Sequence, residues 1–253
     1  MAEGAVYVYG IIPAAEQGTL SVTGVADRDV RLIPHGPVAA LVSDFDDDAL
    51  AAAREVRRHW RVLEQASKAA TVLPVRFGTV MESDDVVREE MLVPHAERLE
   101  ALLRELEGRV QLSLKGGYDE EQLLREVIAG SPAISRLRER VRMLPEAAGY
   151  YERIRLGELI ASEVARRREQ DTGVALTMLE PLAVAARAEE PRRPDAAFDL
   201  SFLVERDGID SFSQAVGALD EKVGARIQLR YVGPLPPYSF AQDELTAGAD
   251  PWA

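Results

Sequence analysis

The order of hydrophobic and polar residues predicts several strands near the start of the chain. The apolar run Val6–Ile12 contains a glycine and is followed by a proline, which indicates a buried strand. Val30–Ile33 and Val38–Asp44 flank the turn-forming residues 34–37, so we expect a β-hairpin there. The short run Thr71–Pro74 predicts one more strand in the same region.

Between and after these strands the hydrophobic period becomes helical. An amphipathic helix is predicted by apolar residues at helical spacing, which are Val56, Trp60, Leu63 and Ala70. Ser83 is the expected N-cap of a second helix, which Pro94 interrupts. A third helix carries one apolar face and ends at Gly108; that face consists of Leu99, Leu102, Leu103 and Leu106.

The middle of the chain predicts one strand and a long helical stretch. Arg109–Lys115 alternates apolar and polar residues, which indicates a half-exposed strand ended by Gly116 and Gly117. Residues 119 to about 169 have helical character, with breaks near 130–132 and at Pro145. The last of these helices is expected to present one apolar stripe, made of Tyr150, Ile154, Gly157, Ile160 and Val164.

The remainder predicts two strands, a helix and a final strand, and the whole order points to a fold class. The expected ranges are Ala175–Ala186, Phe198–Glu205, Asp210–Val223 and Arg226–Val232. The second half therefore reads as a split βαββαβ pattern with a helical insertion, and the first half reads as the same pattern with its first helix replaced by a loop. We predict an α+β protein with two tandem ferredoxin-like domains at residues 1–107 and 108–240, an insertion at about 119–169 and a tail at 241–253.

Composition narrows the class of protein. The 253 residues carry a formal net charge of −13, which disfavours nucleic acid and anionic membranes as partners. The chain has no cysteine, which excludes thiol catalysis, cysteine-ligated zinc and a disulfide framework. The sequence shows neither signal-peptide features nor an apolar run of transmembrane length, so we expect a cytoplasmic protein.

No motif for catalysis, metal binding or cofactor binding stands out. His35, His59 and His95 are isolated from one another and fit no ligand spacing. The acidic run from Asp44 to Asp48 resembles part of a calcium loop, but Ala49 occupies the position that needs glycine, so helix capping is the better interpretation. Phosphate-binding glycine motifs and nucleophile elbows are also missing. We therefore predict a binding or structural protein without catalytic residues, metal or cofactor.

Two segments carry more sequence constraint than packing alone requires. Residues 72–80 are apolar apart from one arginine, and residues 231–240 are rich in proline and aromatic residues. The prolines predict an extended, polyproline-II-like path. This segment either docks across the protein's own domains, our preferred interpretation, or binds a proline-reading domain through Pro234 and Pro237. The candidate interaction residues are Pro74, Arg76, Phe77, Gly78, Gly233, Pro234, Pro236, Pro237, Tyr238 and Phe240.

The same segments carry a resemblance to the gas vesicle protein L/F family. The resemblance rests on the blocks 7–11, 72–79, 149–153 and 233–240, supported by His59, Gly157 and residues 202–204, in family order over residues 5–240. Leu235 stands where the family often has tryptophan, but the position stays apolar.

This resemblance implies a cytoplasmic, gas-vesicle-associated accessory or minor structural protein. It implies two ferredoxin-like domains with helical additions, contact with the small hydrophobic major shell protein and other vesicle proteins, and no known catalytic residues. The two alternatives are a small-molecule-sensing regulator and an enzyme whose carboxylates meet only in the fold. Whether the chain is of the L or the F type, and whether it acts as a chaperone or stays in the wall, is left open by the sequence.

Overall fold

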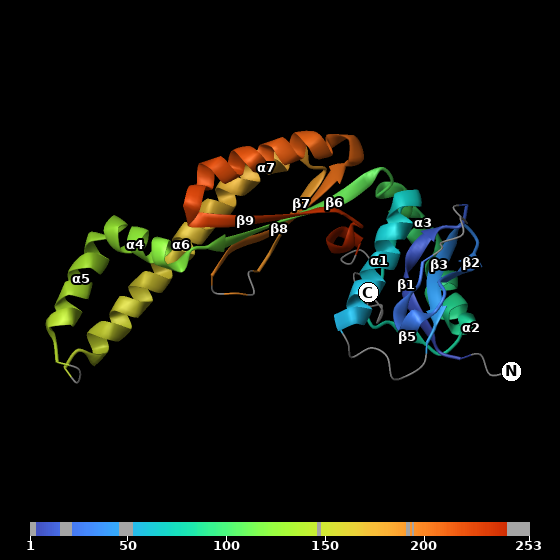
Figure 1. Cartoon of the computed structure of the whole chain (residues 1–253), viewed down its shortest axis with the longest axis horizontal. Helices are drawn as coiled ribbons and strands as arrows, with labels where there is room; N and C mark the ends of the chain where they lie inside the picture. The colour runs from blue at the N-terminus through green and yellow to red at the C-terminus, as the bar shows by residue number, and fades with distance from the viewer. Residues whose placement is uncertain are drawn as a thin grey trace. The chain divides into compact units, whose positions relative to one another are not determined.

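The computed structural model describes residues 4–15, 22–45, 53–145, 148–190, 193 and 195–241 (Figure 1). The chain has a mixed α/β fold with two sheets and several helices, which confirms the α+β class at this level. The acidic residues Asp46 and Asp48, Ala49 and most of the predicted tail lie outside the described residues.

The first sheet is built around the strand nearest the N-terminus. Its strand order is β2-β3-β1-β4, with β5 also paired to β1, and the pairs are antiparallel. The predicted strand and hairpin are confirmed. The bounds are β1 Val6–Pro13, β2 Arg31–His35, β3 Val38–Asp44, β4 Leu73–Pro74 and β5 Val80–Met81.

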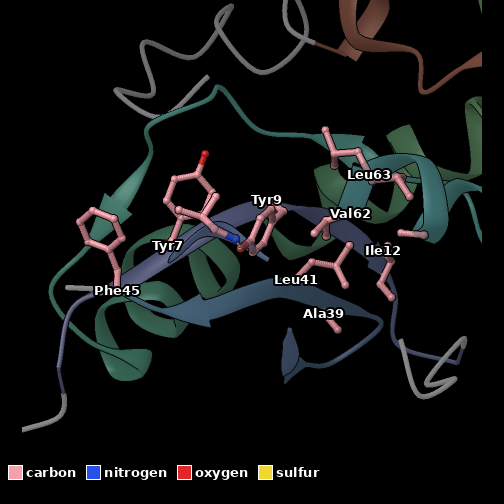
Figure 2. Close-up of a cluster of buried hydrophobic side chains, with 11 residues drawn as sticks. Tyr7, Tyr9, Ile12, Ala39, Leu41, Phe45, Val62 and Leu63 are labelled. Carbon is pink, nitrogen blue, oxygen red and sulfur yellow. Dashed lines mark hydrogen bonds between the residues drawn. The ribbon is translucent and has the colours of Figure 1, made fainter. Parts of the chain in front are cut away.

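Strand β1 is buried on both faces. Successive strand residues point to opposite faces, and every residue from Val6 to Ile12 is buried, so both faces of β1 are covered. On one face Tyr7, Tyr9 and Leu41 pack with Val62 and Leu63 of helix α1, Ala53–Ala69 (Figure 2). This layer is the core of the N-terminal region.

The segment after β5 is helical, as predicted. Ser83 accepts a hydrogen bond from the Val86 N–H and caps α2, Asp84–Val86. The chain continues as a π-helix, Val87–Leu92, and a 3₁₀ turn that contains Pro94. Helix α3, Ala96–Glu105, then buries the expected leucines.

The predicted amphipathic helix is confirmed as α1, but its predicted apolar face is correct only at Leu63. Val56 and Trp60 are each more than one-third exposed, whereas the buried residues are Glu55, His59, Val62, Leu63 and Ala66. Glu55 and His59 are polar but lie on the buried side, so the apolar pattern predicts the wrong face. Both have hydrogen-bond partners inside the fold.

The second sheet has the strand order β7-β8-β6-β9. Its bounds are β6 Arg109–Tyr118, β7 Ala185–Glu189, β8 Ala196–Glu205 and β9 Ile227–Leu235. Strand β6 runs through Gly116 and Gly117 instead of ending there. A Cβ on Gly116 would lie 2.8 Å from the Phe198 ring, so glycine here serves strand packing and not chain reversal. Helix α7, Ile209–Val223, buries its four predicted apolar residues, which are Phe212, Val216, Leu219 and Val223.

The helical insertion is longer than predicted. It consists of α4 Glu120–Gly130, α5 Pro132–Met143 and α6 Tyr150–Leu179, so residues 175–179 are helical and the strand predicted at Ala175–Ala186 is wrong over most of its length. The stripe predicted on α6 is also wrong at its start, because Tyr150 and Ile154 are exposed. The C-terminal part of α6 is buried at Asp171, Ala175 and Leu179.

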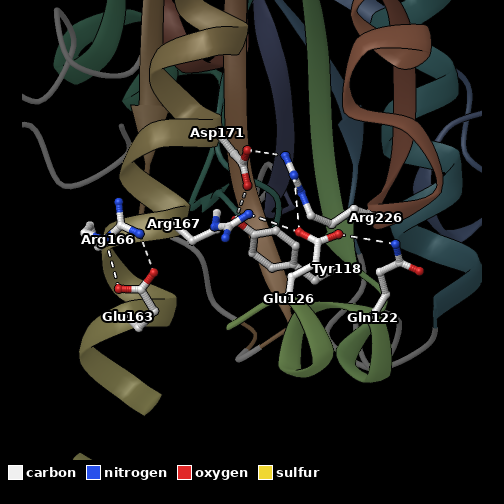
Figure 3. Close-up of polar contacts among 8 residues, drawn as sticks. All are labelled: Tyr118, Gln122, Glu126, Glu163, Arg166, Arg167, Asp171 and Arg226. Atoms are coloured by element: carbon white, nitrogen blue, oxygen red, sulfur yellow. Dashed lines mark hydrogen bonds and ion pairs between the residues drawn. The ribbon is translucent and has the colours of Figure 1, made fainter. Parts of the chain in front are cut away.

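A network of charged residues fixes α6 to its neighbours (Figure 3). Asp171, 5% exposed, accepts hydrogen bonds from the Tyr118 hydroxyl at 2.8 Å and from Arg226 at 2.5 Å. Glu126 of α4 pairs with Arg167 at 3.0 Å and with Arg226 at 3.4 Å. Burial, and secondarily the Asp171 carboxylate, raise the pKa of Tyr118, so its hydroxyl stays protonated as a donor.

Contacts along the chain define two compact units. The first takes the described residues of Met1–Gln111, Leu203–Arg206 and Gly233–Ala253, and the second takes those of Leu112–Phe202 and Asp207–Val232. Strands β6, β8 and β9 therefore each contribute residues to both units. The domain limits after residues 107 and 240 stay predictions.

Candidate functional site

The segment 72–80 forms two short pairings with β1 and a loop between them. Leu73 and Pro74 pair with Ile11 and Gly10, and Val80 pairs with Tyr7. Leu73 and Pro74 are buried because they pair directly with β1. The two backbones approach so closely that a Cβ on Gly10 would lie 2.7 Å from the Leu73 carbonyl oxygen. Pro74 is therefore a packing residue of the sheet.

The loop between these pairings, Arg76–Thr79, is held by a buried tyrosine. The Gly78 N–H donates to the Tyr7 hydroxyl at 3.1 Å, and the Val8 N–H donates to the Thr79 carbonyl at 3.0 Å. Gly78 has φ +92°, a conformation that favours glycine. Arg76 is exposed and Phe77 is half-buried, so this loop presents a charged and an aromatic side chain on a fixed backbone.

His59 completes this buried cluster. It is 1% exposed, and its Nδ1 lies 2.9 Å from the Tyr7 hydroxyl. The rings of Tyr9 and Phe77 lie 5.7 and 5.6 Å from the imidazole. Burial lowers the pKa of His59 to about 4 and raises that of Tyr7, so both groups are neutral at pH 7. The cluster is sealed and neutral, which suits packing and not proton transfer to a substrate.

Glu55, one turn before His59, is a second buried polar residue. Its carboxylate accepts hydrogen bonds from the Ala26 N–H at 2.9 Å, from Arg54 at 2.9 Å and from Arg58 at 3.1 Å. Burial alone would raise the pKa of Glu55, but these donors outweigh it and the pKa is lowered. This carboxylate therefore fixes the turn Val25–Asp27 to α1. Within the described ranges no group of three or more potential metal ligands occurs.

The proline-rich segment docks on the first unit. β9 continues to Leu235, and a helical turn begins at Tyr238, so the predicted extended path is wrong beyond Pro237. The Ser239 N–H donates to the side-chain carbonyl of Gln111 at 2.8 Å, and the Tyr238 ring lies 5.6 Å from Trp60.

Burial separates the candidate residues of this segment into two groups. Pro236, Pro237 and Phe240 are buried, whereas Gly233 and Pro234 are exposed. The segment packs on other residues of the first unit. Docking across the two predicted domains stays a prediction. A proline-reading domain could not bind Pro237 without undocking the segment.

The two candidate segments meet at a groove in the first unit. A cavity of about 240 Å³ is lined by Val72, by the end of α1 and by residues 233–237. Its charged residues already have partners: Lys68 pairs with Glu64 at 3.4 Å, and Arg206 donates to the Ser67 carbonyl at 3.3 Å. The groove brings together Gly233, Pro234, Pro236 and Pro237; it does not include Pro74, Arg76, Phe77, Gly78, Tyr238 or Phe240.

Sequence reasoning missed several residues that build the site. The sequence predicts Tyr7 as one residue of a buried strand and His59 as an isolated histidine, but it does not predict their contact. Gln111 is predicted on a half-exposed strand, whereas it is buried. These residues could be predicted from the sequence by looking for a polar residue within an otherwise apolar, buried pattern. Such a residue needs a partner, and here each has one.

The fold and this site define a mixed α/β protein that offers apolar and aromatic contact surface. Over residues 5–242 the sequence matches the family described as "Gas vesicle synthesis protein GvpL/GvpF". The chain belongs to this family, as the resemblance predicted. Among the described residues, no helix is long and apolar enough to cross a membrane.

Named relatives and solved structures agree with this assignment. The chain is 35% identical to gas vesicle protein F of Streptomyces sp. (strain CB03234), over 93% of this chain and 99% of the relative. It is 28% identical to gas vesicle protein L1 of Halobacterium salinarum, over 94% of this chain and 90% of the relative. The crystal structure of GvpF from Anabaena sp. PCC7120 is similar with a TM-score of 0.81 and 30% identity, covering 95% of this chain and 99% of that one. The family match therefore establishes a gas-vesicle-related role.

Proposed function

We propose that this protein is a non-enzymatic accessory or minor structural protein required for gas vesicle formation, and that it binds the hydrophobic major shell protein during nucleation or assembly. The observation that carries the proposal is the family match over residues 5–242, together with relatives named gas vesicle proteins F and L. A cytoplasmic location and contacts with other vesicle accessory proteins belong to the same proposal.

The charge of the chain supports such a role. A shell subunit exposes apolar surface before it is assembled, and a partner that covers this surface must itself stay dispersed. A net charge of −13 makes copies of the chain repel one another and so favours solubility. The groove beside residues 233–237 supplies apolar contact, with Leu235 half-buried and Pro234 exposed at its wall.

The strand orders support the finer fold proposal of two ferredoxin-like sheets. Read from the last strand of each half, the orders are β4-β1-β3-β2 and β9-β6-β8-β7. Both place the third strand between the first and the second, as the split βαββαβ arrangement requires. Between β1 and β2, the described residues 14–15 and 22–30 form no α-helix and contain only the 3₁₀ turn Val25–Asp27.

The alternative function, a regulator that senses a small molecule, has less support. A metabolite site needs convergent polar groups that are free to bind. In the groove the charged side chains Lys68 and Arg206 are already engaged by the protein. No observation favours this alternative over an assembly role.

The proposal is tested by co-expression with the major shell protein and affinity purification from the supernatant. The wild-type chain is expected to keep the shell protein soluble and to co-purify with it. Leu235→Arg and Pro234→Arg, at the groove, are expected to reduce the recovered shell protein at least several-fold. Val232→Arg, an exposed residue of the same strand that does not line the groove, is the matched control and should bind as wild type.

Recovery of this protein alone, with the shell protein aggregated, would refute direct binding. Equal loss from Val232→Arg would instead refute the groove as the contact. Unchanged circular dichroism of each variant excludes misfolding as the cause.

A further inference from the structure

Helix α6 exposes two aromatic side chains at its N-terminal end, and α5 exposes a methionine at its C-terminal end. We call α5 together with residues 150–168 of α6 the arm. Tyr150 and Tyr151 are 61% and 80% exposed, with ring centroids 5.5 Å apart, and Met143 is 80% exposed. Large apolar side chains gathered in this way on a surface mark an interaction site, and tyrosine pairs are frequent anchors of interfaces.

The arm is also basic in a strongly acidic chain. Helix α5 carries four arginines and one glutamate, whereas the chain has a net charge of −13. Within the part of the chain that the structure describes, four exposed arginines of the arm have no ion-pair partner; they are Arg136, Arg138, Arg140 and Arg155. Arg155 lies one turn after Tyr151, so an aromatic and a cation share one helix face.

The first unit holds a cavity of complementary character. Its volume is about 350 Å³, and it is lined by Arg76–Met81 and Glu90, with Phe77, Val80 and Met81 as its apolar wall. Glu82, Glu89 and Glu90 are exposed beside it, and none has an ion-pair partner among the described residues. Arg76 and Glu90 line the cavity, and the nearby Arg88 is paired with Asp85, so the unpaired glutamates make the local charge negative.

The wall of this cavity is preorganised. The bonds from Tyr7 and Val8 described above hold the Arg76–Thr79 loop, and β5 pairs with β1 directly after it. A binding site that is already ordered loses less conformational entropy when a side chain enters it. The cavity is therefore suited to receive a rigid aromatic group flanked by positive charge.

We propose that the tyrosine tip of the arm docks into this cavity on a second copy of the chain. The unpaired arginines of one copy then face the unpaired glutamates of the other, and Tyr151 enters the apolar wall. Contact between two arms is disfavoured because it would bring two sets of unpaired arginines together. The resulting contact joins different surfaces of the two copies, so it is heterologous and extends head to tail unless it closes into a ring.

A nucleic acid is the main competing occupant of the basic arm. Phosphates would attract the arginines, but they would not use the apolar wall around Phe77, and the net charge of the chain opposes them. The experiment distinguishes these occupants.

Sedimentation velocity of the full chain over a range of concentrations tests the proposal. In low salt the wild type is expected to associate with rising concentration, and about 0.5 M salt should weaken the association at least tenfold because it screens the ion pairs. Tyr151→Ser with Arg155→Glu blocks the arm, and Val80→Arg with Glu90→Arg blocks the cavity. The control, Val232→Ser with Arg230→Glu, makes a similar change on β9 and should associate as wild type.

Mixing the two blocked variants gives the decisive result. Each alone is expected to be monomeric, whereas a one-to-one mixture should form a dimer and nothing larger, since one intact arm and one intact cavity remain. A mixture that stays monomeric, or a wild type that stays monomeric in low salt, would overturn the proposal. So would a single-stranded DNA oligonucleotide that binds the wild type through the arm while the protein does not self-associate. Tyr151→Ser and Glu90→Gln singly, with unchanged circular dichroism, replace any double variant that fails to fold.

Discussion

His59 combines complete burial, a neutral imidazole and a single hydrogen bond. Its surroundings are aromatic, from Tyr7, Tyr9, Trp60 and Phe77, and within the described residues no charged group is found to offset the cost of protonating it. A histidine that fits no ligand spacing is expected to be an ordinary surface or packing residue, and the structure shows the packing role for His59. Its partner Tyr7 lies 52 positions away, so no local pattern could have predicted the pair.

Acid is expected to destabilise the fold through His59. Its pKa is about 4 in the folded protein and about 6.5 when unfolded, so the unfolded state binds more protons between these values. The stability that depends on the neutral ring is complete above about pH 6.5 and falls as the pH drops towards 4, by about 2 kcal/mol at pH 5.

Urea unfolding of the wild type and of His59→Gln at pH 7.5 and pH 5 checks this expectation. The glutamine does not titrate, so the variant should lose less stability between the two pH values, and the difference isolates the histidine from the carboxylates. Equal losses in the two proteins would contradict a depressed pKa for His59.

Gly10 tests the close contact between β1 and β4. A Cβ at this position would lie 2.7 Å from the Leu73 carbonyl oxygen, a backbone atom that cannot move aside without shifting the strand. Gly10→Ala is therefore expected to cost about 1–3 kcal/mol of unfolding free energy. Gly117→Ala, on strand β6 with open space around it, is the control and should change the unfolding midpoint little. A neutral Gly10→Ala would show that the two strands are less tightly packed.

At the scale of elements, apolar periodicity predicted the pieces that pack in an ordinary way. The buried face of α7 follows directly from it, while turn residues predict the hairpin β2–β3 and a capping residue predicts the helix start at Ser83. The failures lie where polar residues are buried or apolar residues are exposed. The polar residues Glu55 and His59 occupy the inner face of α1. In α6, the exposed Tyr150 and Ile154 belong to the stripe that is predicted to face inwards.

The length of α6 could not be predicted for a related reason. The residues of α6 after 170 are apolar enough to predict a strand. In the structure this part of α6 is helical, and its Asp171 accepts hydrogen bonds from Tyr118 and Arg226. Partners supplied by distant elements decided the outcome, and they are invisible in a local window.

Asp171→Asn is expected to destabilise the second unit by about 3 kcal/mol, because it removes a buried charge that both Tyr118 and Arg226 use. Hydrogen exchange of α4 and α6 should rise together. The control is Glu163→Gln, which breaks the pair with Arg166 on the same helix. That arginine is exposed to solvent, so the unfolding midpoint should change little. Equal effects of the two variants would mean that the network does not anchor α6.

Gly157 lies inside α6, with open space where a Cβ would be. Gly157→Ala should raise the helix stability by about 0.5–1 kcal/mol, since alanine loses less backbone entropy on folding. Faster exchange of α6 amides in the variant would contradict a purely helical role for this position.

At the scale of the whole molecule, the family blocks, the sheet order and the charge point to one role. The candidate residues divide into a packing group at Pro74, Pro236, Pro237 and Phe240, and an accessible group at Arg76, Pro234 and, in part, Phe77. The sequence could predict that these segments are constrained, but it could not predict which residues face outwards, because the turn at Tyr238 and the Gln111–Ser239 contact depend on the fold.

The central claim, a requirement in gas vesicle formation, is tested most directly by electron microscopy and flotation of cells whose copy of this gene has been deleted. The account predicts that these cells lack gas vesicles and do not float, and that the wild-type gene restores both. It also predicts that Leu235→Arg fails to restore them at equal protein level, whereas Val232→Arg succeeds. Normal vesicles in the deleted strain would contradict the account.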